Sequence, residues 1–214
     1  MTGPLFPPAP ARPDLLAPDP SGPDLAWPAA PLKLVVSGPV GAGKTTFVQT
    51  LSQTPVVATE AQASEDIGKT NTTVAFDFGT LHLAGQELHL YGTPGQDRFS
   101  FMWEVLCEGA LGLVLLVAGD RPQDFAHART ILDFITTRIA VPFLVGVTRQ
   151  DQPRVWDPAD VALYFGLPVA QVMGLNATDP QQAREVLARL LELTLSPEGL
   201  LPAGAGAPAV ERTF

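Results

Sequence analysis

One octapeptide constrains this chain more than any other feature: GPVGAGKT at residues 38–45. It matches the pattern G-x-x-x-x-G-K-[ST] in full, with a predicted buried strand before it and a predicted helix after it, as the pattern requires. The glycines let the backbone bend until successive N–H groups point inward around an anion. The N-terminus of the following helix adds a partial positive charge. The segment therefore predicts a phosphate-binding loop.

Side chains in and beside this loop are expected to take separate tasks. The Lys44 ammonium should reach the β- and γ-phosphates of a nucleotide, and the Thr45 hydroxyl should ligate Mg²⁺. The residues that we predict to bind phosphate are Gly38, Val40, Gly41, Ala42, Gly43, Lys44, Thr45, Thr46 and, from a later glycine turn, Gly95.

Short apolar runs alternate with helical patterns along the middle of the chain, which predicts an α/β fold. The last helix should begin with Asp179 as its N-cap and Pro180 at its first position. Another should begin at Asp157 and end at Gly166. We expect a doubly wound, mostly parallel six-stranded sheet with helices on both faces. Its predicted strands are residues 32–37, 73–79, 87–92, 111–118, 142–147 and 169–174.

The two ends of the chain differ in composition from this middle part. Residues 1–31 are rich in proline, which fixes φ and removes backbone donors, and are predicted to be a disordered tail. Residues 196–214, rich in Pro, Gly and Ala, are predicted to be a second flexible tail. The nucleotide-binding domain should then span residues 32–195.

Charge and composition exclude several classes of partner. The net charge is −9 and only three residues are lysine, which argues against a nucleic-acid surface and against docking on an anionic membrane. No apolar run reaches the ~18–20 residues of a membrane span, and the N-terminus lacks a signal-peptide pattern. The single cysteine, Cys107, lies in an apolar context and is expected to be a buried thiol. A cytoplasmic protein is expected.

Two further segments indicate where a nucleotide state could be sensed. A threonine run enters a strand in TTVAFDFG at residues 72–79, and a hydroxyl there could complete the magnesium shell while the γ-phosphate holds the loop. A second strand ends in GTPGQDRF at residues 92–99, where Gln96 could orient the attacking water.

These motifs resemble those of the Ras-like small GTPases, and in particular the bacterial branch with the gliding-motility MglA type and the GTP-binding subunits of actinobacterial conservon operons. TTVAFDFG followed by GTPGQDRFSFMW is the most specific stretch. The resemblance covers residues 32–195 and implies GTP/GDP and Mg²⁺ as ligands, slow GTP hydrolysis, and a Roadblock-type protein as regulator or activator. It matches Thr73, or else Thr72, to the switch-one threonine that ligates the metal, and Gly95 and Gln96 to the switch-two pair.

The chain departs from the Ras-like pattern in switch two, where D-x-x-G carries an aspartate near the metal. That position is Gly92 here. Asp77, on the strand predicted to run antiparallel beside this one, could supply the carboxylate from next door. Fully extended, Asp77 and Thr73 lie about 13 Å apart, so both reach one metal only if the loop folds inward. Asp77 could equally be a strand carboxylate that faces solvent.

A second departure concerns the base. The family reads N-K-x-D after the fifth strand, and this chain has Thr148, Arg149 and Asp151 in those places. Asp151 should accept from guanine, Arg149 could stack on the ring, and Thr148 is a weaker substitute for asparagine. Asn176, Ala177 and Thr178 lie where the family places its S-A-K segment, whose backbone could bond the base oxygen. A plain surface aspartate is the alternative for Asp151.

A third departure is the lack of an arginine in switch one, which leaves Arg98 as a candidate finger in cis or an ordinary surface arginine. The predicted catalytic residues are therefore Gln96, Lys44 and Arg98. The aromatic residues at 99–103 could be core or a partner-binding face. Two other functions stay open: a nucleotide-binding scaffold without turnover, and a P-loop ATPase or kinase.

Overall fold

The computed structural model describes residues 31–63, 72–83 and 85–195. The side chains of residues 58–63, 72–75, 97 and 195 lie outside this description. Both predicted tails fall outside it, apart from residue 31, and so does Ala84 in the predicted turn before Gly85.

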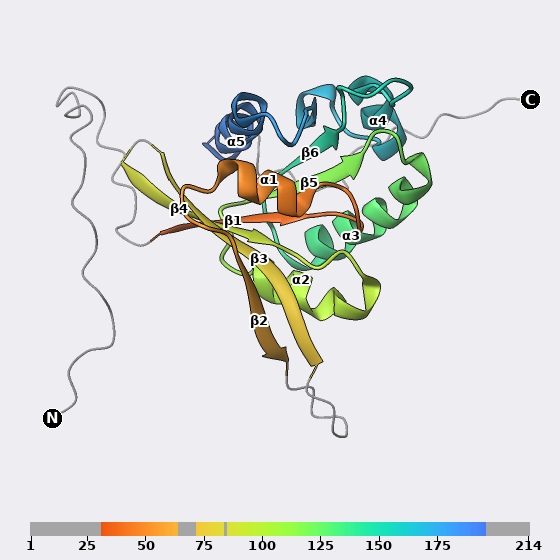
Figure 1. The fold of residues 1–214 in the computed structure, drawn as a ribbon. Helices are drawn as coiled ribbons and strands as arrows, with labels where there is room; N and C mark the ends of the chain where they lie inside the picture. The colour runs from red at the N-terminus through yellow and green to blue at the C-terminus, as the bar shows by residue number, and fades with distance from the viewer. Residues whose placement is uncertain (1–30, 64–71, 84, 196–214) are drawn as a thin grey trace, which may run out of the picture.

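Within the described ranges, seven strands form one sheet in the order β2-β3-β4-β1-β5-β6-β7 (Figure 1). β1, β4, β5, β6 and β7 run parallel, and β3 is antiparallel to both of its neighbours. The predicted doubly wound α/β fold is confirmed. The strands are β1 (Leu32–Ser37), β2 (Val57–Ala63), β3 (Thr72–Leu83), β4 (Gln86–Gly92), β5 (Gly112–Ala118), β6 (Phe143–Thr148) and β7 (Val172–Gly174).

The sheet has one strand more than the six predicted, because β2 pairs with β3 at its edge. The β2 sequence, VATEAQA, lacks the apolar run and the enrichment in β-branched and aromatic residues that mark a strand. β7 is shorter than predicted, since Val169–Gln171 forms a 3₁₀ turn before it.

Helices cover both faces of the sheet, and each face has its own core. On one face α1 (Lys44–Leu51) and α5 (Pro180–Leu195) pack over β1, β4 and β5. On the other face lie α2 (Ser100–Cys107), α3 (Phe125–Arg138) and α4 (Pro158–Phe165). β5 between the two layers is buried along its whole length, as predicted.

The predicted helix ends are confirmed. The Asp157 carboxylate accepts from the Ala159 amide at the start of α4, and Gly166 ends that helix in the left-handed conformation. The Asp179 carboxylate accepts from the Gln181 amide at the start of α5. Cys107 is fully buried, and burial raises the pKa of its thiol to about 12. No helix in the described part of the chain is long and apolar enough to cross a bilayer.

Candidate nucleotide site

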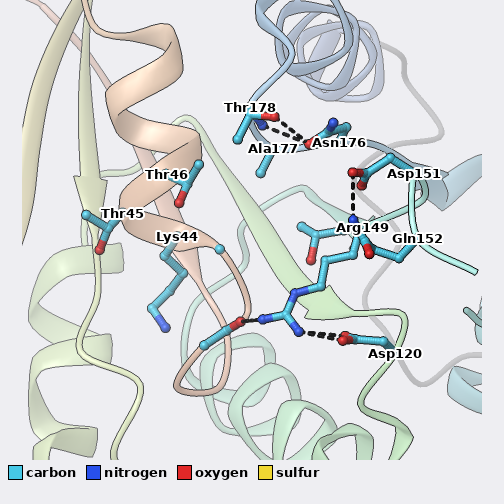
Figure 2. Close-up of a pocket in the computed structure, with 13 residues that line it drawn as sticks. Lys44, Thr45, Thr46, Asp120, Arg149, Asp151, Gln152, Asn176, Ala177 and Thr178 are labelled. Atoms are coloured by element: carbon cyan, nitrogen blue, oxygen red, sulfur yellow. Dashed lines mark hydrogen bonds and ion pairs between the residues drawn. The ribbon is translucent and has the colours of Figure 1, made fainter.

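A cavity of about 590 Å³ opens at the carboxyl ends of the parallel strands, the edge at which open α/β sheets bind ligands. Figure 2 shows its two ends: the start of α1 on one side, and the loops after β6 and β7 on the other. The loop after β5 contributes a carboxylate between them. The lining residues are Gly41, Gly43, Lys44, Thr45, Thr46, Asp120, Thr148, Arg149, Asp151, Gln152, Asn176, Ala177 and Thr178.

The phosphate loop has the strained geometry that its glycines predict. Gly38, Gly41 and Gly43 have φ of 139°, 79° and 97°, which side chains with a Cβ rarely adopt. A Cβ on Gly38 would lie 2.1 Å from the Leu116 carbonyl oxygen of β5. The loop can therefore take this path close to the sheet only with glycine at that position.

Lys44 points back over the phosphate loop. Its ammonium donates to the carbonyl oxygens of Gly38 at 2.8 Å and Pro39 at 2.7 Å. Burial lowers the pKa of Lys44 to about 8, and the nearby negative charge of Asp77 partly opposes this shift. A desolvated cation bound only by neutral carbonyls is well suited to exchange them for a phosphate oxygen.

Two residues that we expected at the base line the cavity and also contact the phosphate loop. The buried Thr148 hydroxyl donates to the carbonyls of Ala42 at 3.0 Å and Val117 at 3.2 Å. The Arg149 guanidinium donates to the Gly41 carbonyl at 2.9 Å.

Arg149 is also held by a carboxylate, since its guanidinium contacts both oxygens of Asp120 at 2.8 and 2.6 Å. Its own φ of 65° is rare for a residue with a side chain. Such backbone strain persists where the surroundings fix it, often at binding sites.

The opposite end of the cavity offers groups that suit a base. Asp151 lines it with an exposed side chain, and one of its oxygens accepts from the Gln152 amide group at 2.9 Å. The Asn176 side chain accepts from the Thr178 amide at 3.1 Å, which fixes the turn after β7. The Ala177 carbonyl accepts from the Thr50 hydroxyl, whereas its amide donates to no described residue.

Asp77 on β3 lies beside the β4 position at which the Ras-like pattern has an aspartate. β3 and β4 pair Asp77 with Gly92, and a Cβ on Gly92 would lie 3.1 Å from Asp77 Oδ2. That oxygen accepts from the Thr45 hydroxyl at 2.6 Å. Two hard oxygen ligands thus converge beside the phosphate loop, a donor set that fits Mg²⁺. The backbone of Thr73 lies in β3 opposite Gln62, and its side chain is outside the described part.

The loop between β4 and α2 comes close to the phosphate loop at its glycine. A Cβ on Gly95 would lie 2.7 Å from both Lys44 Nζ and the Val40 nitrogen. Gln96 is exposed, and the exposed Arg98 stacks its guanidinium on the Phe99 ring at 4.6 Å. Neither lines the cavity in this conformation.

The aromatic residues at 99–103 differ in burial, and a partner-binding face formed by them stays a prediction. Trp103 is buried and donates from its indole to the Pro94 carbonyl at 2.8 Å, which makes it core. Phe99 and Phe101 are half-buried around Met102.

Three residues at the site were not predicted: Asp120, Arg121 and Gln152. Asp120 lies two residues after β5, and a carboxylate at the end of a buried parallel strand was a usable signal, whereas the arginine beside it carried none. Arg121 does not line the cavity but contacts the phosphate loop from outside, with Nη1 3.4 Å from the Val40 carbonyl oxygen.

Solved structures with the same fold include nucleotide-binding domains. The Arl6 BBS3 small GTPase from Trypanosoma brucei, solved with the nucleotide analogue GppNp, aligns with a TM-score of 0.61 at 15% identity and covers 77% of this chain and 98% of its own. The G domain of the T. maritima FeoB iron transporter aligns at 0.58 with 16% identity and covers 76% and 98%. At these identities the similarity shows the fold.

Sequence comparison adds a relative and a family. An uncharacterized protein of Methanocaldococcus jannaschii, MJ1339, is 36% identical over 91 residues, which are 41% of this chain and 51% of that protein. The chain thus spans about half the length of this curated relative. The profile of a family described as conserved hypothetical ATP binding protein matches residues 56–202, well over half of the chain and entirely after the phosphate loop. The chain belongs to this family of conserved hypothetical ATP binding proteins.

Proposed function

We propose that this protein is a guanine-nucleotide switch that binds GTP and GDP with Mg²⁺ and hydrolyses GTP slowly. The observation that carries the proposal is one cavity with a phosphate loop at one end and the Asp151 carboxylate at the other. A nucleoside diphosphate is complementary to this cavity, because its anionic phosphates suit the phosphate loop and its flat base can donate hydrogen bonds to a carboxylate.

The base end supports guanine through two complementary groups. Guanine presents two N–H donors on one edge, and the Asp151 carboxylate can accept a hydrogen bond from each. Guanine also has a carbonyl oxygen, to which the Ala177 amide can donate. Binding would require Gln152 to release the Asp151 oxygen that it now contacts. Adenine offers no such pair of donors, so the carboxylate would lose its hydrogen bonds to water without replacement.

The metal end is supported by Thr45 and Asp77. Mg²⁺ prefers a few protein oxygens and several from water and phosphate, so two protein groups suffice. When bound, the ion would offset the negative charge of the phosphates. Thr45 would ligate it and Asp77 would orient Thr45 or a bound water, which gives the Asp77 carboxylate a use other than facing solvent.

Gly95 supports the assignment of a switch. Because this glycine already contacts Lys44 and Val40, the β4–α2 loop cannot keep this position once a γ-phosphate lies beside the Lys44 ammonium. The conformation of Gln96 and Arg98 would then depend on the nucleotide, and a partner could sense it. A Roadblock-type regulator is the partner class that the motif resemblance suggests.

Adenine nucleotide is the second candidate, and the description of the family favours it. Competition against a fluorescent GDP analogue, with Mg²⁺ present, separates the two. We expect unlabelled GDP to displace it at least about a hundredfold better than ADP. Asp151→Asn should weaken GDP and improve xanthosine diphosphate, whose base carries an oxygen in place of the guanine amino group. Equal or better displacement by ADP would establish the adenine alternative.

A scaffold without turnover is tested separately. Single-turnover phosphate release from bound GTP should be slow alone and faster with a Roadblock-type partner, and Gln96→Ala should slow release while leaving the dissociation constant nearly unchanged. If no phosphate appears over hours at any partner concentration, the scaffold is the better description.

A further inference from the structure

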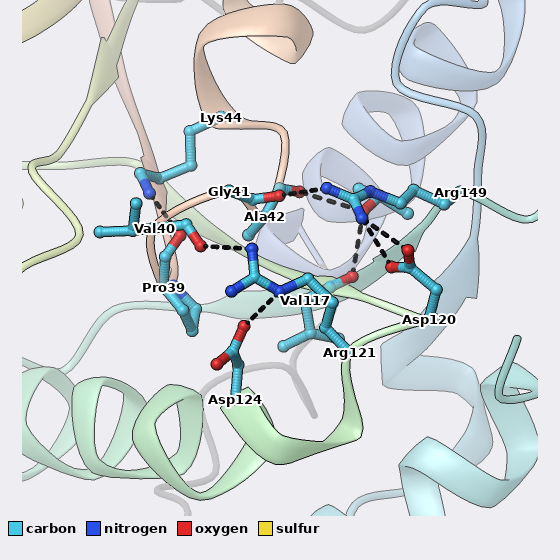
Figure 3. Close-up of polar contacts among 11 residues, drawn as sticks. Pro39, Val40, Gly41, Ala42, Lys44, Val117, Asp120, Arg121, Asp124 and Arg149 are labelled. Atoms are coloured by element: carbon cyan, nitrogen blue, oxygen red, sulfur yellow. Dashed lines mark hydrogen bonds and ion pairs between the residues drawn. The ribbon is translucent and has the colours of Figure 1, made fainter.

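Two arginines from different loops contact consecutive carbonyls of the phosphate loop (Figure 3). Arg121, after β5, places Nη1 3.4 Å from the Val40 oxygen. Arg149, after β6, donates to the Gly41 oxygen at 2.9 Å. The Lys44 ammonium contacts the loop from another side, where it donates to two carbonyls that precede Val40.

Arg121 also lies close to Gly41, the next residue of the loop. A Cβ on Gly41 would lie 2.4 Å from Arg121 Nη1. The φ of 79° is what favours glycine at this position, and the lack of a Cβ leaves room for the guanidinium outside the loop.

Arg121 is itself fixed by its neighbours. Its Nε pairs with the Asp124 carboxylate at 2.8 Å, and the backbone between them closes a turn in which the Asp124 amide donates to the Arg121 carbonyl at 3.0 Å. Arg149 is also paired with a carboxylate, although through Nη1 and with the sequence-distant Asp120, so each guanidinium has an acidic partner beside the loop.

Contacts to these carbonyls orient the amides that a phosphate needs. In a planar trans peptide, the C=O of one residue and the N–H of the next point in opposite directions. A donor outside the loop that contacts the Val40 oxygen therefore turns the Gly41 amide inward. The Gly41 oxygen is held in the same way, but the Ala42 amide that follows it already donates to the Pro39 carbonyl at 3.2 Å. Thr148, which donates to the Ala42 oxygen, turns the amide of Gly43 inward.

We propose that Arg121, oriented by Asp124, is a positioning residue for phosphate binding that acts through the Val40 peptide. It does not line the cavity, so it touches the loop and not the nucleotide. The inference rests on the proposed binding of a nucleoside diphosphate at this loop, but not on whether the base is guanine or adenine.

The test measures the loop and the bound phosphate separately. The dissociation rate of the tighter-binding diphosphate, GDP or ADP, should rise about five- to tenfold in Arg121→Ala, the effect of losing one charged but partly exposed hydrogen bond. The ³¹P resonance of the bound β-phosphate should shift, because the amides around it change direction. Arg121→Lys should recover part of the rate, and Asp124→Asn should shift both quantities in the same direction by less.

Arg189→Ala is the matched control. Arg189 pairs with Glu192 at i,i+3 with 35% of its side chain exposed, against 36% for Arg121, but lies on α5 away from the loop. It should leave rate and resonance unchanged. An Arg121→Ala protein that binds the diphosphate with the wild-type rate and resonance would overturn this inference alone. A wild-type protein that binds neither diphosphate would overturn the proposed function, and this inference with it.

Discussion

Replacing Thr148 with Val removes one hydroxyl and keeps the branched shape of the side chain. The hydroxyl is buried and donates to the Ala42 and Val117 carbonyls. A buried acceptor left without its donor costs about 1–3 kcal/mol. We therefore expect the variant to lose about 2 kcal/mol of unfolding free energy. For a domain of this size that corresponds to about 4–8 °C in Tm.

The same change should weaken nucleotide binding. Without its donor, the Ala42 peptide can rotate, and the Gly43 amide no longer points steadily at the phosphate. One such contact corresponds to about tenfold in the dissociation constant of GDP. Urea unfolding of the nucleotide-free protein measures the first effect, and titration with a fluorescent GDP analogue measures the second.

Thr148→Ser is the control, because it keeps the hydroxyl and removes only the methyl group. It should bind GDP as the wild type does and lose about 1 kcal/mol of stability from the missing methyl. If Thr148→Val keeps both stability and affinity, the hydroxyl does not support the loop. If Thr148→Ser is as weak in binding as Thr148→Val, packing of the methyl group and not the hydrogen bond explains the effect.

Three further outcomes follow from burial and backbone geometry. Cys107 should react with a maleimide at pH 8 only as fast as the protein unfolds. The pKa of its thiol is about 12 in the folded protein against 9.0 in the unfolded chain. Its contribution to the free energy of unfolding is therefore complete below pH 9 and falls as the pH rises toward 12. Leu190→Ala should cost about 3 kcal/mol in urea unfolding, and adding Gly112→Ala should recover part of it, since a Cβ there would occupy the space of the leucine, 2.9 Å from its Cδ2. Gly38→Ala should abolish nucleotide binding and lower Tm sharply, because its Cβ would overlap the Leu116 carbonyl; a wild-type melting curve would contradict the observed loop geometry.

The parts of the site that follow from local sequence were predictable. The phosphate loop needs only a strand, glycines and a helix in succession, and the cap residues Asp157 and Asp179 act within their own turns. The approach of Asp77 to the metal position was also accessible. It depends on the register of two neighbouring strands, which a short hairpin largely fixes.

Other features depend on contacts between distant segments. Thr148 is 106 residues from Ala42 in sequence, and only the packing of β6 against the loop shows that its hydroxyl donates to a carbonyl of this loop. Arg121 is 81 residues from Val40, and an arginine after a strand is by itself an ordinary surface residue. β2 could not be predicted because an edge strand gains its order from pairing with β3 and not from burial of an apolar run.

The role of the β3 carboxylate can be tested by removing it and by placing a carboxylate on β4. If Asp77 serves the metal, Asp77→Ala should remove most of the slowing of GDP release that Mg²⁺ causes relative to EDTA. Gly92→Asp alone should be poorly tolerated, because its Cβ would lie 3.0 Å from the Asp77 Cβ and two carboxylates would share one space.

The double variant Asp77→Gly, Gly92→Asp returns the carboxylate to the strand position that Ras-like proteins use, and Asp77→Gly alone is its reference. It should recover part of the Mg²⁺ effect, although the new side chain starts from the neighbouring strand and approaches Thr45 from a different angle. Recovery would mean that the site requires a carboxylate in this space and not a particular strand to carry it. A Mg²⁺ effect that survives Asp77→Ala unchanged would instead make Asp77 a strand residue that only accepts a hydrogen bond from Thr45.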